Sequence, residues 1–137
     1  AIPRLQLRAR DEPGQTLMSK ILIVEDNLGN MGFAATVLET AGHQILQAWN
    51  AEMGLQLAGE HLPDCIFMDI QLPGMDGLEA CRLLKADPRT RHIPICVVTG
   101  FAMPDDAQRN PAAGFDRYLA KPVQYKDLLA AAQAMTQ

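Results

Sequence analysis

The chain has 137 residues, of which 48% are hydrophobic and 20% are charged, and this composition fits one globular domain with a single core. Its formal net charge of −4 at pH 7 leaves no basic surface for a nucleic acid or for an anionic membrane. No uninterrupted apolar run approaches the roughly 18 residues of a membrane-spanning helix. We therefore expect neither a nucleic acid nor a membrane as a partner.

Residues 1–17 differ from the rest of the chain, because they contain two prolines and show no regular hydrophobic pattern. The following segment, MSKILIVEDN, looks like a natural start at Met18. We expect residues 1–17 to be an expression extension or a disordered arm, and residues 18–137 to form the domain.

From Met18 onward, short apolar runs alternate with helix-like stretches. Strands are predicted at 21–24, 43–49, 65–68, 95–98 and 115–122, and helices at 32–42, 51–61, 76–87, 105–114 and 124–135. Several of the strand runs are almost continuously apolar, as in parallel strands that are covered on both faces. Five strand–helix units are too few for an eight-unit barrel, so the pattern predicts an α/β fold with an open, doubly wound parallel sheet.

The three cysteines, Cys65, Cys81 and Cys96, lie in or beside apolar segments. Their spacing is not that of a metal site, since no Cys-x-x-Cys pair is present. We expect buried, reduced thiols and a cytoplasmic protein.

Polar side chains directly follow the predicted strands, at the edge where open parallel sheets place their functional sites. These residues are Glu25, Asp26, Asp69, Thr99 and Lys121. Three carboxylates close together repel one another, and a hard divalent cation such as Mg²⁺, or Mn²⁺ in its place, removes that cost. Lys121 adds a positive charge. The arrangement predicts that Asp69 is a nucleophile that forms an aspartyl phosphate, and that Thr99 hydrogen-bonds the phosphoryl group.

Four segments, ILIVEDN, MDIQLPGMDG, VTGFA and YLAKP, resemble the receiver domains of two-component response regulators in their order and spacing. The resemblance covers residues 18–137. It implies a flavodoxin-like (βα)5 fold with strand order 2-1-3-4-5. It also implies that a histidine kinase or a histidine phosphotransfer protein phosphorylates Asp69.

The resemblance further implies a ligand set for the metal ion. Asp26, Asp69 and the backbone carbonyl of Gln71 would coordinate Mg²⁺ directly, and Glu25 would act mainly through a water molecule. Such a protein catalyses only its own phosphorylation and dephosphorylation, and is not an enzyme with turnover.

Other residues would transmit the phosphorylation signal, again by resemblance. Lys121 would contact the phosphoryl group, and the Lys121–Pro122 peptide bond would be cis. Tyr118 would turn inward together with Thr99, and the change would alter a protein-binding surface for a downstream target.

Simpler explanations exist for each residue taken alone. Asp69 could be a solvated strand end, Glu25 and Asp26 could cap the next helix, and Tyr118 could be an ordinary half-buried aromatic. Two functional alternatives are a phosphorylation-independent adaptor with a receiver fold and a receiver fragment of a hybrid histidine kinase. The joint placement of the acids, Thr99 and the lysine favours the phosphoacceptor.

Pro111 departs from the family pattern, because it lies inside the predicted helix 105–114. An interior proline costs a helix about 3 kcal/mol or more. We therefore expect a shortened, irregular or mobile helix there, next to a surface that many receivers use for output.

The start of the first helix is a second departure. Family members often carry a basic residue near Met31 or Gly32, whereas here the segment is small and apolar. Leu28, Met31 and Phe33 could contact an amphipathic partner helix. The alternative is that Phe33 packs inward and that Met31 is incidental.

Overall fold

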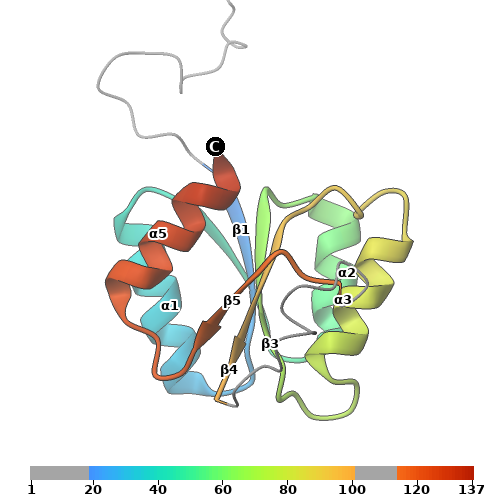
Figure 1. The fold of residues 1–137 in the computed structure, drawn as a ribbon, viewed down its shortest axis with the longest axis horizontal. Coiled ribbons are helices and arrows are strands. Elements are labelled where there is room, and N and C mark those ends of the chain that lie inside the picture. Colours follow the sequence, from blue (N-terminus) through green and yellow to red (C-terminus); the bar gives the residue numbers. More distant parts are fainter. Residues whose placement is uncertain (1–18, 101–113) are drawn as a thin grey trace, which may run out of the picture.

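The computed structural model describes residues 19–100 and 114–137 (Figure 1). Within these ranges the elements are β1 (Lys20–Val24), α1 (Leu28–Thr40), β2 (Gln44–Ala48), α2 (Ala51–His61), β3 (Cys65–Asp69), α3 (Gly77–Ala86), β4 (Ile95–Thr99), β5 (Arg117–Ala120) and α5 (Tyr125–Thr136). The expected arm at 1–17, and the predicted helix with Pro111 except for its last residue, lie outside the described residues.

The strands form one parallel sheet in the order β2-β1-β3-β4-β5, so the predicted fold is confirmed. β3 lies at the centre, paired with β1 on one side and with β4 on the other. All five of its residues are buried, including the terminal Asp69. A continuous apolar run is what such a doubly covered strand requires.

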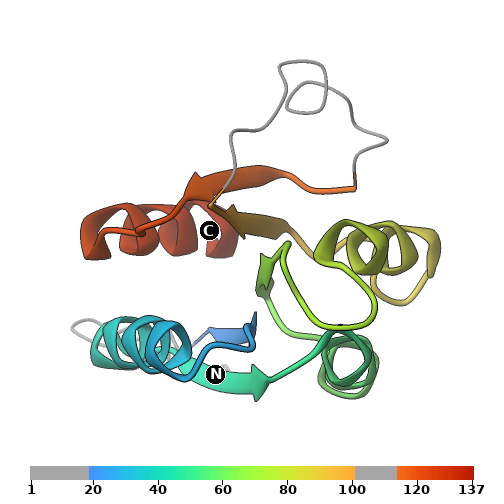
Figure 2. The ribbon, with the colours of Figure 1, turned by 90° about the horizontal axis from the view of Figure 1, so that it is seen from below.

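Helices cover both faces of the sheet: α1 and α5 lie on one face, and α2 and α3 lie on the other (Figures 1 and 2). Alternate side chains of each strand point to opposite faces. In β1, Ile21 and Ile23 pack on the α1/α5 side, whereas Leu22 and Val24 pack on the α2/α3 side. No helix within the described residues is long and apolar enough to cross a membrane.

The cysteines are free and buried, as expected. Cys65 and Cys96 belong to the core under α1 and α5, and Cys81 belongs to the core under α2 and α3. Burial raises the pKa of each thiol to about 12. These thiols therefore stay protonated at neutral pH.

Helix α1 begins at Leu28, four residues earlier than predicted. Its N-cap is Asn27, whose side chain accepts a hydrogen bond of 2.9 Å from the backbone N–H of Asn30. Neither Glu25 nor Asp26 caps this helix, so the capping alternative for these two acids is wrong. The capping bond stabilises the first turn, although that turn contains Gly29.

Gly77, the first residue of α3, touches the end of β3. A Cβ atom at this position would lie 2.2 Å from the carbonyl oxygen of Asp69. The Gly77 N–H donates a hydrogen bond of 2.9 Å to the carbonyl oxygen of Ile70. The loop after β3 thus returns to the strand it leaves, and only glycine leaves room for this contact.

His43, beside the start of β2, supports a prediction about how the stability of the fold depends on pH. Among the described residues, its buried Nδ1 has no hydrogen-bond partner. Burial lowers the pKa of His43, and nearby Asp64 opposes that shift. The unfolded chain therefore binds a proton at His43 more tightly than the folded chain does. The contribution of neutral His43 to the stability of the fold is present above the unfolded pKa of 6.5. It is lost as the pH falls through the lower pKa of the folded chain.

We expect His43→Gln to reduce the loss of stability between about pH 7.5 and about pH 5.5. Urea denaturation at the two pH values measures this loss. His92→Gln, at an exposed position, is the control and should retain it. An unchanged pH dependence in His43→Gln would contradict the assignment.

Candidate functional site

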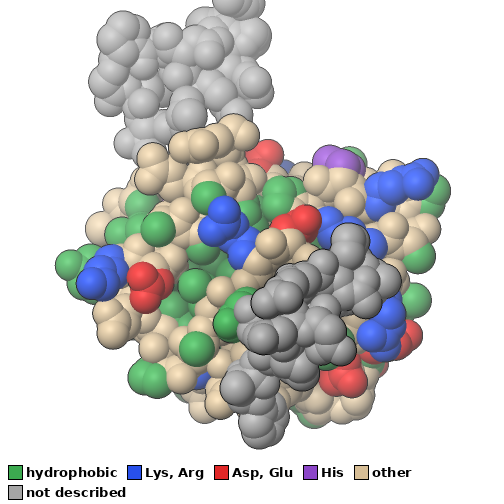
Figure 3. All heavy atoms as spheres, in the orientation of Figure 1, with side chains coloured by type: hydrophobic (Ala, Val, Ile, Leu, Met, Phe, Trp, Pro, Cys, Tyr) green, Lys and Arg blue, Asp and Glu red, His purple; other side chains and the backbone are tan. Residues whose placement is uncertain are grey.

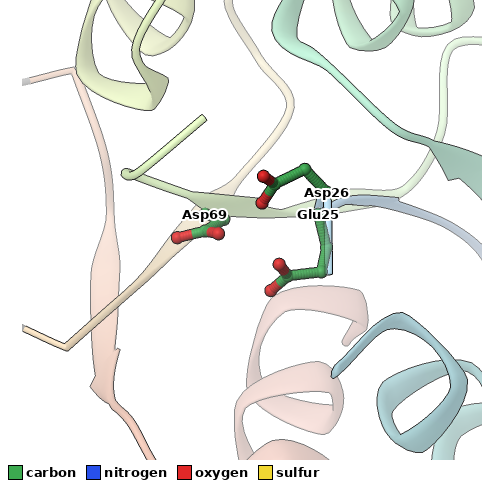
Figure 4. A group of neighbouring side chains, drawn as sticks. All are labelled: Glu25, Asp26 and Asp69. Carbon is green, nitrogen blue, oxygen red and sulfur yellow. The ribbon is translucent and has the colours of Figure 1, made fainter. Parts of the chain in front are cut away.

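Three carboxylates meet at the carboxyl edge of the sheet (Figure 4). One oxygen each from Glu25, Asp26 and Asp69 lies within 4.8 Å of the others. Glu25 directly follows β1 and Asp69 ends β3, and these strands are parallel neighbours, so the two acids reach the same edge. Glu25 is 6% exposed and Asp69 is 3% exposed, whereas Asp26 faces solvent.

Lys121 bridges two of these acids. Its Nζ lies 3.2 Å from Asp69 Oδ2 and 3.3 Å from Glu25 Oε1. The Lys121 backbone N–H also donates a hydrogen bond of 2.8 Å to the carbonyl oxygen of Thr99, which fixes the start of the loop after β5. The Lys121–Pro122 peptide bond is cis. The lysine thus reaches the acids from a strand that does not pair with β3.

The backbone supplies donors to the remaining carboxylate oxygens. Asp69 Oδ1 accepts a hydrogen bond of 3.1 Å from the N–H of Gln71, and Glu25 Oε2 accepts one of 3.0 Å from the N–H of Asn27. Both carboxylates are therefore oriented by the loops that follow their own strands. The Gln71 side chain reaches toward Gly100, where a Cβ atom would lie 3.8 Å from Gln71 Oε1.

The electrostatics of the cluster favour an added cation. Burial is the largest effect on Glu25 and raises its pKa, and the N–H of Asn27 partly opposes the shift. Burial alone would lower the pKa of Lys121, but the charges of Asp69 and Glu25 outweigh it and raise that pKa. Lys121 is therefore protonated at neutral pH, and its single positive charge contacts two of the three carboxylates. Oxygen ligands with this excess of negative charge fit Mg²⁺.

The other two predicted residues, Thr99 and Tyr118, differ in how close they lie to the carboxyl edge of the sheet. Thr99 is the last residue of β4 and is fully buried, one position beyond the residue that pairs with Asp69. Tyr118 lies inside β5, half-buried against the core under α2 and α3. The structure therefore brings Thr99 and Lys121 to the same edge as the acids, whereas Tyr118 is set back along its strand.

A cavity of about 460 Å³ lies beside the acids and was not predicted. Glu25, Asp69 and Lys121 contribute to its lining, and α1, α5, the sheet and the loop between β5 and α5 form the rest. Gly77, which packs against the backbone of Asp69, was not predicted either. Neither feature has a local sequence signal, because both depend on how separate segments approach each other.

The response regulator receiver domain model matches residues 21–133 of this chain. The chain therefore belongs to the receiver domain family of two-component systems, and its acidic cluster is consistent with the magnesium-binding phosphoacceptor site of such a domain. Domains of this class are signalling switches that interact with histidine kinases and downstream targets.

Among curated proteins, the chain is similar to the polar-differentiation response regulator DivK. It is 44% identical to DivK of Brucella anthropi over 103 residues, which cover 75% of this chain and 84% of that protein. It is 41% identical to DivK of Brucella ovis over 107 residues, which cover 78% of this chain and 87% of that protein.

Solved structures give the same family. The receiver domain of a sensor histidine kinase from Pseudomonas aeruginosa PAO1 has a TM-score of 0.79 and 30% identity, and the match covers 88% of this chain and 98% of that one. That domain holds a magnesium ion in its active site cleft. The chemotaxis response regulator CheY4 of Vibrio cholerae has a TM-score of 0.80 and 26% identity, with 87% and 99% covered.

Proposed function

We propose that this chain is a phosphorylation switch in which Asp69 accepts a phosphoryl group from a phosphohistidine. The donor is a histidine kinase or a histidine phosphotransfer protein, and the switch acts in the cytoplasm. The observation that carries the proposal is the placement of Asp69. Its carboxylate is buried at the sheet edge, 3.2 Å from Lys121 Nζ and beside two further acids.

The acids and one backbone group would hold the metal ion. Asp26, Asp69 and the carbonyl of Gln71 would bind Mg²⁺, or Mn²⁺ in its place, and Glu25 would act through a water molecule. When bound, the cation neutralises charge on the phosphoryl oxygens. Hydrogen bonds from the Asn27 and Gln71 N–H groups keep two of the carboxylates in place for this role.

The transfer step follows from the position of Asp69. One of its carboxylate oxygens attacks phosphorus, the P–N bond of the phosphohistidine breaks, and the imidazole nitrogen keeps the electron pair and takes a proton from water. The ammonium of Lys121 contacts the transferred phosphoryl group. Its raised pKa keeps this positive charge in place as negative charge arrives.

The signal to a downstream target starts at the same edge of the sheet. Thr99 hydrogen-bonds the phosphoryl group, Tyr118 changes its position, and a protein-binding surface shifts its population toward the form that a downstream target binds. The chain catalyses its own phosphorylation and dephosphorylation and turns over no separate substrate.

The first test uses the small donor acetyl phosphate and measures intact mass. With Mg²⁺ present, we expect one phosphoryl group per chain, because the cation offsets the repulsion between phosphate and the three acids. With EDTA in place of Mg²⁺, the adduct should fall at least about tenfold. Equal adduct in both conditions, or none in either, would contradict the proposal.

A further inference from the structure

The cavity beside the acids has an apolar interior and an acidic mouth. Alternate residues of a strand point to the same face of a sheet, so Phe67 and Asp69 of β3 share the face that α1 and α5 cover. In β1, Ile23 packs on that face, and Glu25 follows it two residues later. All four residues line the cavity. The cavity therefore runs from the carboxylates into the apolar layer between the sheet and the helices.

The helices form the walls of this cavity. Phe33 and Ala34 of α1 form one side, and Leu128 of α5 forms part of the other. Phe33 is 42% exposed whereas Met31 is buried, so the alternative in which Phe33 packs inward is wrong. Hydrophobic side chains also gather on the half of the molecule that α1 and α5 occupy in Figure 3. Exposed apolar groups beside a cavity mark a contact surface, so the cavity can receive an apolar group from solvent.

The charges at the mouth favour a cation. The carboxylates of Glu25, Asp26 and Asp69 lie together, and a single ammonium, that of Lys121, contacts two of them. The remaining oxygens of Glu25 and Asp69 accept hydrogen bonds from backbone N–H groups, which carry no net charge. The cluster therefore keeps an excess of negative charge. This excess attracts a cationic head group and repels an anionic one.

We propose that the cavity binds a small organic cation, an arylalkylammonium ion. Its ring lies against Phe33 and Phe67, because aromatic rings pack favourably on one another. Its ammonium has three N–H donors and donates them to the oxygens of Glu25 and Asp69. The cavity volume of about 460 Å³ lies within the roughly 300–1,000 Å³ of small-molecule sites, which suits one ring with a short chain.

The ligand would also regulate the phosphoacceptor, and this part of the inference rests on the proposed function. The ammonium and Mg²⁺ require the same carboxylate of Asp69. Each therefore excludes the other, and a bound ammonium ion opposes phosphoryl uptake. The cavity thus couples the level of an apolar amine to the state of the switch.

Three probes of similar size and different charge test the binding. Phenethylamine is a cation at neutral pH, phenethyl alcohol is neutral and phenylacetate is an anion. Two-dimensional amide NMR of the isotope-labelled chain without Mg²⁺ gives each dissociation constant, and the signals of Ile23 and Phe67 report on the cavity. We expect the amine to bind at least about tenfold more tightly than the alcohol, because hydrogen bonds between charged groups are the stronger ones. Phenylacetate should bind most weakly.

Competition with Mg²⁺ tests where the ammonium lies. Mg²⁺ at about ten times its own dissociation constant should weaken phenethylamine binding about tenfold. Binding of phenethyl alcohol should change by less than about twofold, because the alcohol depends mainly on the apolar interior. In the reverse experiment, saturating phenethylamine at limiting Mg²⁺ should slow adduct formation from acetyl phosphate at least about fivefold. Added Mg²⁺ should restore the rate.

Ala34→Leu tests the role of the cavity. The larger side chain narrows the space from α1 and should weaken phenethylamine binding at least about tenfold. Acetyl phosphate with Mg²⁺ should still give the adduct, and the amine should no longer slow its formation. The matched control is Ala134→Leu, the same change at an exposed position of α5 that does not line the cavity. It should bind the amine within about twofold of the unchanged chain. If Ala34→Leu does not fold, the three probes and the Mg²⁺ competition on the unchanged chain decide.

Several results would overturn the inference. These are equal binding of the amine and the alcohol, tightest binding of phenylacetate, and no binding of any probe. Amine binding that Ala34→Leu leaves unchanged would place the ammonium on the acids outside the cavity and would also overturn it. Cavity signals that shift when the chain alone is diluted, with no response to the amine, would assign the cavity to a second copy of the chain and would overturn it too.

The proposed function is tested separately by the adduct from acetyl phosphate in the absence of amine. An adduct without amine binding would sustain the proposed function and overturn the ligand site. Amine binding without any adduct would sustain the ligand site and overturn the proposed function.

Discussion

Replacing Asp69 with asparagine is expected to abolish phosphoryl uptake from acetyl phosphate in the presence of Mg²⁺. The amide has no anionic oxygen to attack phosphorus, and it is a weaker ligand for a hard cation. The shape of the side chain is retained, and the amide oxygen can still accept the hydrogen bond from the Gln71 N–H. The free energy of unfolding should change by no more than about 1 kcal/mol, because relief of carboxylate repulsion offsets the weakened contact with Lys121.

The matched control for this variant is Asp76→Asn. Asp76 caps α3 by accepting a hydrogen bond of 2.8 Å from the Glu79 N–H, and asparagine caps helices equally well. This variant makes the same chemical change outside the cluster and should take up phosphate normally. Intact mass gives both results. A full adduct on Asp69→Asn would show that another residue is the acceptor, and peptide mapping would then identify it.

Replacing Gly77 with alanine is expected to destabilise the domain by about 3 kcal/mol. The new Cβ atom would lie 2.2 Å from the carbonyl oxygen of Asp69 and 2.8 Å from the Ile70 Cα. Both neighbours are backbone atoms at the end of the central strand, so neither can rotate away. Relief requires that α3 or the end of β3 moves. Urea denaturation measures the loss.

Gly32→Ala is the control for Gly77→Ala, because it makes the same substitution in a helix at a position with open space. Helix propensity predicts a gain there of up to about 1 kcal/mol. The two variants should therefore shift stability in opposite directions. Because the new contact presses on the backbone of Asp69, phosphoryl uptake should also slow in that variant. A Gly77→Ala domain as stable as the unchanged chain would show that the close approach is not needed.

The residues that reach the sheet edge were predictable from sequence because two simple rules applied. Continuous apolar runs marked the buried parallel strands, and the carboxyl ends of such strands lie at the same edge. Glu25 and Lys121 directly follow their strands, and Asp69 ends its strand. Locating the end of each predicted strand was therefore enough to place all three residues at the same edge of the sheet. Their proximity needed no knowledge of long-range packing beyond the order of the strands.

Helix α1 shows why other features were not predictable. It is apolar on nearly all sides, so its sequence contains no amphipathic signal that distinguishes the inward Met31 from the outward Phe33. Its early start depends on one capping bond from Asn27, which outweighs the weak helix propensity of two glycines.

Long-range contacts were a second limit. Lys85 Nζ donates hydrogen bonds of 2.9 Å to the Ile93 carbonyl and of 3.0 Å to Asp116 Oδ2, and Asp116 Oδ2 also accepts from the Ile95 N–H at 2.8 Å. This cluster joins α3, the start of β4 and the residue before β5. Its members are separated by up to 31 positions in sequence, so no local pattern connects them.

The buried thiols provide internal reporters of how the domain opens. A reagent that alkylates thiolates cannot reach Cys65, Cys81 or Cys96 in the closed fold, and a pKa of about 12 leaves almost no thiolate to react. Each modification event therefore records an opening. Cys81 belongs to α3 and packs in the core on the α2/α3 side of the sheet, whereas the other two cysteines are strand residues that pack on the α1/α5 side. Mapping the labelled peptides therefore gives separate opening rates for the two sides of the sheet.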